Sequence, residues 1–242
     1  MHDSLDRDQL YVTVDMLILT VRDGKLTLLL SRRTDAPYAG RWALPGRFVG
    51  QDESAETAVR KLLEEMLPVK DAFLEQLYTF TEVSRDPRGR VVSVAYLVIV
   101  PPKKLEAILA EGRTCFRCFA VTEGQEGPEL AGEDGTRLIG SDLAFDHGRI
   151  VETGVLRLQG KIDYTDVGFR FLNDTGAFPL SELQTVFEAV LGKELDKSNF
   201  RRFIRNRYEE TGRIAPVERA EKQGRGRPAV LYQLNGKEGR SI

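Results

Sequence analysis

The run 46–68, GRFVGQDESAETAVRKLLEEMLP, combines carboxylates and cations at a spacing that suits phosphate chemistry. Glu64 and Glu65 supply the oxygen ligands that Mg²⁺ prefers, and Mg²⁺ in turn binds diphosphates. Lys61 precedes Glu64 by three residues and Glu65 by four, so on a helix its ammonium competes with a metal for them. The segment therefore favours binding of a phosphate ligand over its hydrolysis. On charge pattern alone, a solvated helix face explains the same residues.

The same run predicts an amphipathic helix over Thr57–Met66, because apolar residues recur at helical spacing. Ser54 is placed to cap its N-terminus. Arg60 and Glu64 are four residues apart and are predicted to pair on the surface.

The preceding stretch, 32–46, carries side chains that suit a nucleotide. Guanidinium groups bind phosphate through two hydrogen bonds, and aromatic rings stack on an adenine or frame a ribose. The alternative is that Trp42 is a core anchor and the arginines are ordinary strand-end charges. The predicted effector-binding residues are Arg32, Arg33, Tyr38, Arg41, Trp42, Arg60, Glu64 and Glu65, the last two also as metal ligands.

Composition fits a globular chain of 242 residues with 41% hydrophobic and 30% charged residues. No apolar run is long enough to cross a membrane and the first residues lack a signal pattern, so we expect a cytoplasmic protein. Cys115 and Cys118 have CxxC spacing, but a zinc site needs four ligands and the only histidines are His2 and His147. The cysteines are therefore expected to be free and reduced.

Alternating apolar runs over 10–22 and 25–32 flank Asp-Gly, which predicts a hairpin. Further strands are expected at 74–81 and 90–100, a solvated loop over 122–136, and a helix over 146–161 with Arg157 and Lys161 on its solvent face. Together these elements predict a mixed α/β layer fold in which the helix of the run 46–68 packs on a sheet.

The C-terminal part is basic, since residues 197–240 hold 12 Lys+Arg against 5 Asp+Glu, a net charge of +7. A helical stripe over 183–191 ends at Gly192, and Asp196 caps a second helix. Strand-like runs follow at 214–217 and 230–234. Helix, turn, helix and a hairpin with a basic tip is the order of a winged helix-turn-helix, which binds DNA.

The tip of that hairpin reads Arg225-Gly226-Arg227-Pro228, similar to the core of an AT-hook that enters a minor groove. The alternatives are a solvated helix face for the second helix and an unstructured basic loop for the tip. The predicted DNA-binding residues are Lys197, Ser198, Asn199, Arg201, Arg202, Arg205, Arg225 and Arg227.

The run 46–68 resembles the box of the Nudix family, which asks for a glycine, a glutamate, Arg-Glu, an aliphatic residue, Glu-Glu and a closing glycine. Gly46, Arg60, Leu62, Glu64 and Glu65 fit that pattern, and Asp52 stands for the first glutamate. Lys61 and Leu67 replace a glutamate and the closing glycine, and Arg47 stands where a second glycine is usual. These departures put hydrolysis in doubt.

With a winged helix behind it, the chain resembles the NrtR family of Nudix-related transcriptional regulators over about residues 9–235. The shared stretches include 42–46, 143–147, 178–184, 195–202 and 226–232. The resemblance implies an α/β (α+β) fold: a Nudix-like mixed-sheet sandwich domain (1–161) followed by a C-terminal winged helix-turn-helix domain (162–242).

The resemblance also implies a function: a homodimeric repressor of NAD-metabolism genes that binds double-stranded operator DNA and responds to a nucleotide such as ADP-ribose. No catalytic residue, cofactor or membrane contact is predicted; Mg²⁺ at a weakened site stays open. The alternatives are an active pyrophosphohydrolase of ADP-ribose-like substrates and a related regulator that senses a sugar.

Overall fold

The computed structural model describes residues 9–66, 72–110, 115–125, 127–217 and 230–236. Its larger sheet has the strand order β5-β6-β1-β2-β7-β8-β9, with β3 beside β2 and β4 beside β1. β1 is parallel to β6, whereas its pairings with β2 and β4 are antiparallel, so the sheet is mixed as predicted. The strands are β1 (Tyr11–Arg22), β2 (Lys25–Arg32), β3 (Trp42–Ala43), β4 (Gly46–Phe48), β5 (Phe73–Phe80), β6 (Val91–Ile99), β7 (Phe116–Gly124), β8 (Gly127–Gly132) and β9 (Arg137–Leu138).

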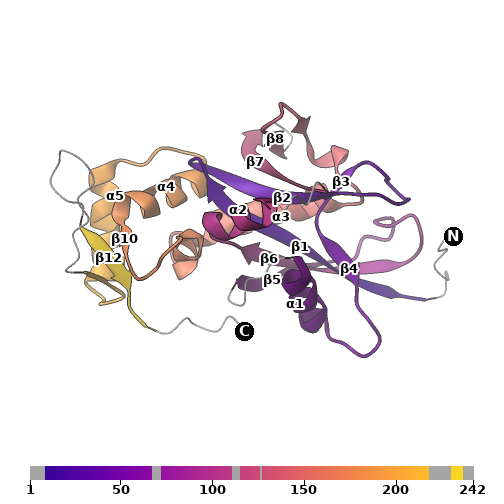
Figure 1. Cartoon of the computed structure of the whole chain (residues 1–242), viewed down its shortest axis with the longest axis horizontal. Helices are drawn as coiled ribbons and strands as arrows, with labels where there is room; N and C mark the ends of the chain where they lie inside the picture. The colour runs from indigo at the N-terminus through magenta and orange to yellow at the C-terminus, as the bar shows by residue number, and fades with distance from the viewer. Residues whose placement is uncertain (1–8, 67–71, 111–114, 126, 218–229, 237–242) are drawn as a thin grey trace.

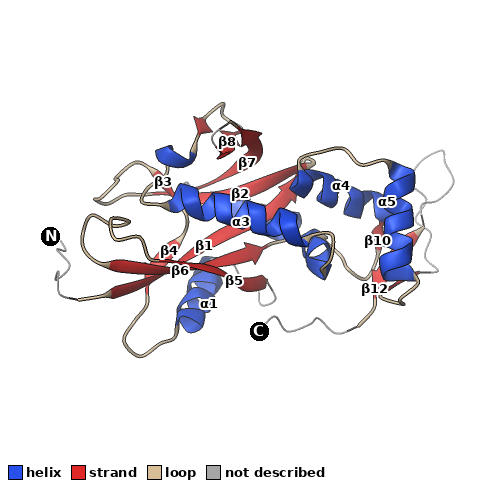
Figure 2. Cartoon of the chain, turned by 180° about the vertical axis from the view of Figure 1, so that it is seen from behind, coloured by secondary structure: helices blue, strands red, loops and turns tan. Residues whose placement is uncertain are grey.

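Both faces of this sheet are covered, because alternate side chains of β1 point to opposite sides. Leu17 and Leu19 belong to one apolar cluster, and Met16 and Ile18 to the other. The first cluster includes side chains of α3 and the second includes side chains of α1 and α2, and Figure 2 shows α3 and α1 on opposite sides of the strands. These helices are α1 (Ala55–Met66), α2 (Pro102–Ala110) and α3 (His147–Lys161).

Helix α3 lies close to its neighbours because it carries glycines where it touches them. A Cβ on Gly148 would lie 2.4 Å from the backbone oxygen of Gly140, in the short 3₁₀ helix η1 (Gly140–Asp142). A Cβ on Gly154 would lie 2.0 Å from a methyl group of Leu17 on β1. Gly160, near the end of the same helix, would meet nothing within 4 Å.

The remaining elements form a winged helix at one end of the molecule, away from β3 and β4 (Figure 1). Gly192, with φ 65°, ends α4, and the Asp196 carboxylate accepts the Asn199 N–H at 2.8 Å to cap α5. Both predicted helix boundaries are thus confirmed. The elements are η2 (Asp166–Phe171), β10 (Phe178–Pro179), α4 (Leu180–Leu191), α5 (Lys197–Ile204), a π-helical turn (Arg205–Glu209), β11 (Ile214–Pro216) and β12 (Leu231–Leu234), with sheet order β10-β12-β11.

One apolar core joins the large sheet to the winged helix. It runs from Leu28 on β2, through Leu158 on α3, to Phe187 and Phe200 on α4 and α5. At the surface, the turn between β1 and β2 also touches α4, since a Cβ on Gly24 would lie 3.9 Å from the methyl group of Thr185. The large sheet with its helices and the winged helix therefore pack directly against each other.

Two sequence-based expectations are wrong. Residues 122–136 are not a loop: β7 continues to Gly124 and pairs with β8, where only alternate residues such as Leu130 need to be apolar. Lys161 does not face solvent, because β5 passes beside α3. Its ammonium bonds Glu75 and lies 5.6 Å from the centre of the Phe73 ring.

Within the described residues, no helix is long and apolar enough to cross a membrane.

Candidate functional site

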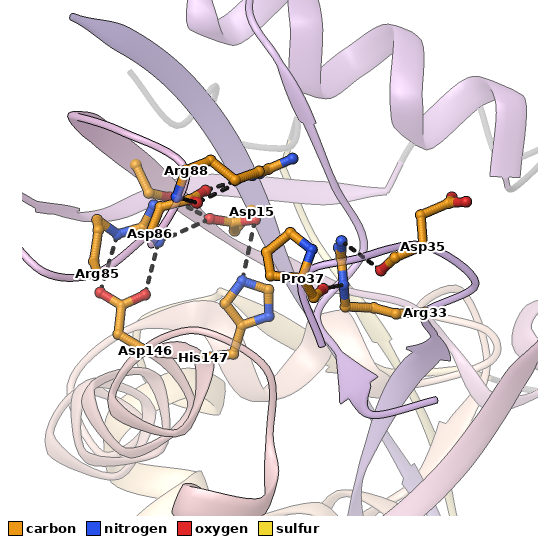
Figure 3. Close-up of polar contacts among 10 residues, drawn as sticks. Asp15, Arg33, Asp35, Pro37, Arg85, Asp86, Arg88, Asp146 and His147 are labelled. Carbon is orange, nitrogen blue, oxygen red and sulfur yellow. Dashed lines mark hydrogen bonds and ion pairs between the residues drawn. The ribbon is translucent and has the colours of Figure 1, made fainter. Parts of the chain in front are cut away.

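A buried cluster of charged side chains lies where β1, the β5–β6 loop and the start of α3 meet (Figure 3). Arg85 donates to both oxygens of Asp146, from Nε at 3.0 Å and from Nη2 at 2.7 Å. The same Nη2 lies 3.4 Å from Asp15 Oδ2, which also accepts the hydroxyl of Ser93. Only 3% of the Arg85 side chain and 8% of the Asp15 side chain are exposed. These charges are held out of water and depend on one another for stabilisation.

His147, the first residue of α3, is held as one neutral tautomer. Its Nδ1 accepts the Leu44 N–H at 2.8 Å, so that nitrogen carries no proton. Its Nε2 lies 3.5 Å from Asp15 Oδ1 and holds the ring proton. Burial lowers the pKa of His147, and this outweighs the raising effect of Asp15. The neutral imidazole thus links the loop before β4 to the charged cluster.

We expect the free energy of unfolding to decrease as the pH falls below about 6.5, the ordinary pKa of histidine. Because the folded pKa of His147 is lowered, only the unfolded chain takes up the proton in that range. The contribution of neutral His147 to the free energy of unfolding is complete above the pKa of histidine in the unfolded chain. Below that pKa it decreases by up to about 1.4 kcal/mol per pH unit. Urea denaturation between about pH 7.5 and 5.5 measures the slope.

The variant His147→Asn should show a flatter slope, because its amide oxygen can accept the Leu44 N–H without titrating. An equally steep slope in this variant would assign the pH dependence to other groups.

A cavity of about 140 Å³ opens beside the cluster. Phe145 lines it and touches Tyr38, with ring centroids 5.0 Å apart. Both residues have positive φ, 56° and 66°, a backbone conformation that is uncommon outside glycine and that concentrates at functional sites. Four arginines line the cavity: Arg33, Arg47, Arg85 and Arg88.

Arg33 is the lining arginine whose charge is least compensated by contact. Its guanidinium donates to the carbonyl oxygens of Pro37, at 2.8 Å, and Asp35, at 3.3 Å. Its Cζ lies 4.8 Å from the centre of the Phe145 ring, and the Cζ of Arg88 lies 5.5 Å from the same ring. Burial and the nearby charge of Arg88 lower the pKa of Arg33. Arg88 itself bonds the Asp86 carboxylate, at 2.8 and 3.0 Å, so Arg33 keeps the less compensated charge of the two and is the better placed to bind an anion.

Gly46 joins the cavity to the run 46–68. A Cβ at this position would lie 2.2 Å from Asp15 Oδ1 and 2.8 Å from the backbone oxygen of Val14. β4 pairs with β1 here, and only glycine allows so close an approach to Asp15.

Glu53 is the carboxylate that faces the N-terminal half of α1, and both of its oxygens are bonded to cationic side chains. Its Oε1 accepts the Gly50 N–H at 2.9 Å and Arg47 at 3.1 Å, and its Oε2 accepts Lys61 at 2.8 Å. The hydrogen bond from Lys61 is the main cause that holds the pKa of Glu53 below its usual value. Asp52, which stands for the first glutamate of the Nudix box in the sequence comparison, is exposed instead. The assignment shifts by one residue because the turn before α1 directs Glu53 inward.

The structure places the other predicted effector-binding residues around this site but mostly outside the cavity. Arg41 lies over the Tyr38 ring, with Cζ 5.6 Å from its centre, and donates to Ser141 O. Arg32 is exposed and donates to Gly40 O at 3.1 Å. Trp42 is partly buried and packs on Phe119 at the edge of the core, which agrees with the alternative of a core anchor.

The predicted pairing of Arg60 with Glu64 is wrong. Arg60 bonds Glu56, one turn earlier, at 2.8 and 3.1 Å. Both partners are equally near in sequence, so spacing does not choose between them. Ser54 does cap α1, because its hydroxyl accepts the Thr57 N–H at 3.1 Å.

The box carboxylates do not fit a Mg²⁺ site. Glu64 and Glu65 are exposed, and Glu65 lies 3.9 Å from an Arg47 nitrogen. Glu53 is bonded to two cations. No group of three or more His, Cys, Asp or Glu residues in the described part of the chain could hold a metal. Lys61, a cation of the protein itself, bonds the carboxylate of Glu53 at 2.8 Å.

A second candidate site is the outer face of α5. Its predicted DNA-contacting side chains are all exposed, and the Asn199 amide oxygen accepts Arg202 at 2.8 Å. Phe200 and Ile204 point inward and anchor the helix to the core. The exposed residues are Lys197, Ser198, Asn199, Arg201, Arg202 and Arg205. Arg225 and Arg227 of the hairpin tip, and Leu67 after α1, lie outside the described residues.

Comparisons with known proteins identify both parts of the chain. The family model of the NrtR DNA-binding winged helix domain matches residues 168–234, and that of the NUDIX domain matches residues 10–129. The ADPR responsive transcriptional repressor NtrR of Acinetobacter baylyi is 32% identical over 225 residues, which cover 92% of this chain and 81% of the relative. This chain belongs to the NrtR family.

Two solved structures resemble this chain over most of its length. Shewanella oneidensis NrtR complexed with a 27mer DNA superposes with a TM-score of 0.73 at 31% identity and covers 93% of both chains. A MutT/nudix family protein from Enterococcus faecalis gives a TM-score of 0.74 at 29% identity and covers 94% of this chain and 89% of its own. An ADP-ribose pyrophosphatase of Methanocaldococcus jannaschii is 30% identical over 141 residues, 58% of this chain and 70% of that relative.

Sequence reasoning missed most of the cavity. Asp15, Arg85 and His147 are far apart in sequence. His147 lies in the stretch 143–147 that carries the resemblance, and Asp15 has a signal of its own, as a lone acidic residue inside an apolar strand. Such a residue needs a buried partner, which the sequence alone does not name.

Proposed function

We propose that this protein is a repressor that binds double-stranded operator DNA through its winged helix and ADP-ribose through its Nudix cleft. The observation that carries the proposal is the exposed cationic face of α5, joined by a continuous core to a cleft lined with arginines. The ADP-ribose response named for the Acinetobacter baylyi relative, and the DNA in the Shewanella oneidensis structure, support the same two ligands. NAD-metabolism genes are the proposed targets.

A cytoplasmic homodimer on a two-fold operator completes the proposal, since paired recognition helices require paired half-sites. Light scattering coupled to size-exclusion chromatography measures the mass of the assembly, and a stable monomer at the concentrations that bind DNA would refute this part.

The DNA claim is tested on the duplex upstream of the protein's own gene by fluorescence anisotropy. We expect Arg201→Ala combined with Arg205→Ala to weaken binding roughly tenfold or more and to reduce the salt slope by about 2, because two phosphate contacts are lost. ADP-ribose should change the affinity of the unmodified protein.

Lys103→Ala with Lys104→Ala is the matched control. It removes the same charge from α2, on the sheet rather than on α5. Equal losses in both double variants would reduce the effect to net charge and would contradict recognition by α5.

The Methanocaldococcus jannaschii relative favours one second candidate, hydrolysis of ADP-ribose. Incubation with ADP-ribose and Mg²⁺, followed by chromatography of the products, separates the two functions. Because Lys61 bonds Glu53 and so competes with a metal ion for its carboxylate, we expect no release of AMP. Rapid release that is abolished by Glu65→Gln would establish the enzyme instead.

A further inference from the structure

Lys61 and Arg47 neutralise the carboxylate through which a metal would have to bind. Both oxygens of Glu53 accept hydrogen bonds from cations, and only 7% of its side chain is exposed. A Mg²⁺ ion would have to displace an ammonium at 2.8 Å and would then find few oxygen ligands in reach. The positive charge that a metal supplies to a diphosphate is already part of the chain.

The cavity offers guanidinium groups directly to an anion. Arg33 donates to the backbone carbonyls of Pro37 and Asp35, and it shares the Phe145 ring with Arg88. Arg88 itself bonds the Asp86 carboxylate, at 2.8 and 3.0 Å. Arg47 lines the same cavity and reaches back to Glu53, so the cavity borders on the box residues. Guanidinium groups match the paired oxygens of phosphate in geometry and stay charged at all relevant pH.

We propose that the diphosphate of the effector is bound by Arg33, Arg47 and Arg88 without a divalent cation, Lys61 serving as the internal counter-ion of Glu53. The proposal rests on the proposed function, in that ADP-ribose is taken as the effector. It makes the response to the nucleotide independent of free Mg²⁺.

The first test is calorimetric titration of the full-length protein with ADP-ribose, once in excess EDTA and once in millimolar Mg²⁺. We expect dissociation constants that agree within about twofold. Binding that needs Mg²⁺ would overturn the metal-free mode and leave the proposed function standing. Absence of binding in both buffers would overturn the proposed effector, and this inference with it.

The second test compares Arg33, which lines the cavity, with an exposed arginine outside it. Arg33→Met should weaken ADP-ribose roughly tenfold or more, because a charge-assisted contact to phosphate is lost. Arg137→Met is the matched control, since Arg137 is exposed on β9 and does not line the cavity, and it should bind nearly as the unmodified protein does. Thermal unfolding of the free variants confirms that both are folded. Equal affinities of the two variants would refute the role of Arg33.

The third test uses Mg²⁺ alone as the probe. Lys61→Glu restores a carboxylate and should produce a rise in melting temperature with Mg²⁺ that the unmodified protein lacks. Lys61→Met removes the ammonium without adding a ligand, and should show a smaller rise. A comparable Mg²⁺-dependent rise in the unmodified protein would show that Lys61 does not exclude the metal.

Discussion

Arg85→Met is expected to lower the free energy of unfolding by about 3–5 kcal/mol, the usual effect of removing one partner from a buried ion cluster. Arg85 is the cation between Asp15 and Asp146, and its side chain is 3% exposed. Methionine fills much of the same space but removes the guanidinium that Asp146 and Asp15 share, so their charges lose their cationic partner. Urea denaturation at neutral pH gives the difference directly.

The control for this variant is Arg60→Met on the surface of α1. Arg60 also makes a two-bond contact with a carboxylate, Glu56, but the two side chains are 54% and 62% exposed. Such a pair contributes only ~0.2–1 kcal/mol. If the two arginine variants lose similar amounts, burial is not what makes the Arg85 cluster important.

Gly148→Ala is expected to destabilise the fold by about 1–3 kcal/mol, as overpacking does. The added methyl group would lie 2.4 Å from the oxygen and 2.5 Å from the Cα of Gly140, and backbone atoms cannot rotate out of the way. Helix α3 must then move at the end where it carries His147, so binding in the cavity should weaken as well. Thermal or urea unfolding gives the first effect, and calorimetry gives the second.

Gly160→Ala in the same helix should have the opposite sign. Its Cβ would meet nothing within 4 Å, and alanine in an exposed helix position stabilises by about 0.5–1 kcal/mol relative to glycine. Destabilisation of equal size in both variants would show that the contact with Gly140 is not the cause.

Local patterns in the sequence predict most elements of this fold. The Asp-Gly hairpin between β1 and β2, the Ser54 and Asp196 caps and the Gly192 stop all depend on neighbouring residues, and all occur as expected. The β7–β8 hairpin was not predicted, because a strand with one face exposed to solvent needs apolar residues only on its other face. Its glutamates and glycines are therefore typical of a loop as well.

The candidate site was harder to predict because contacts between distant segments build it. Arg33 belongs to the stretch 32–46, whose guanidinium groups suit a phosphate, whereas Arg85 and Arg88 come from the loop between β5 and β6, for which the sequence predicts no ligand. The choice of Glu53 over Asp52, and of Glu56 over Glu64 as the partner of Arg60, depends on which way a side chain points. Spacing alone does not contain that information.

The hairpin of β1 and β2 has a mechanical consequence. Asp15 and Arg33 line the cavity near one end of this hairpin, and the turn that contains Gly24, at the other end, lies beside α4. Because the two strands are hydrogen-bonded to each other, a displacement of one end of the hairpin would be transmitted to the helix beside its other end. The hairpin thus connects the cavity to the helix that precedes α5 through the shared hydrophobic core.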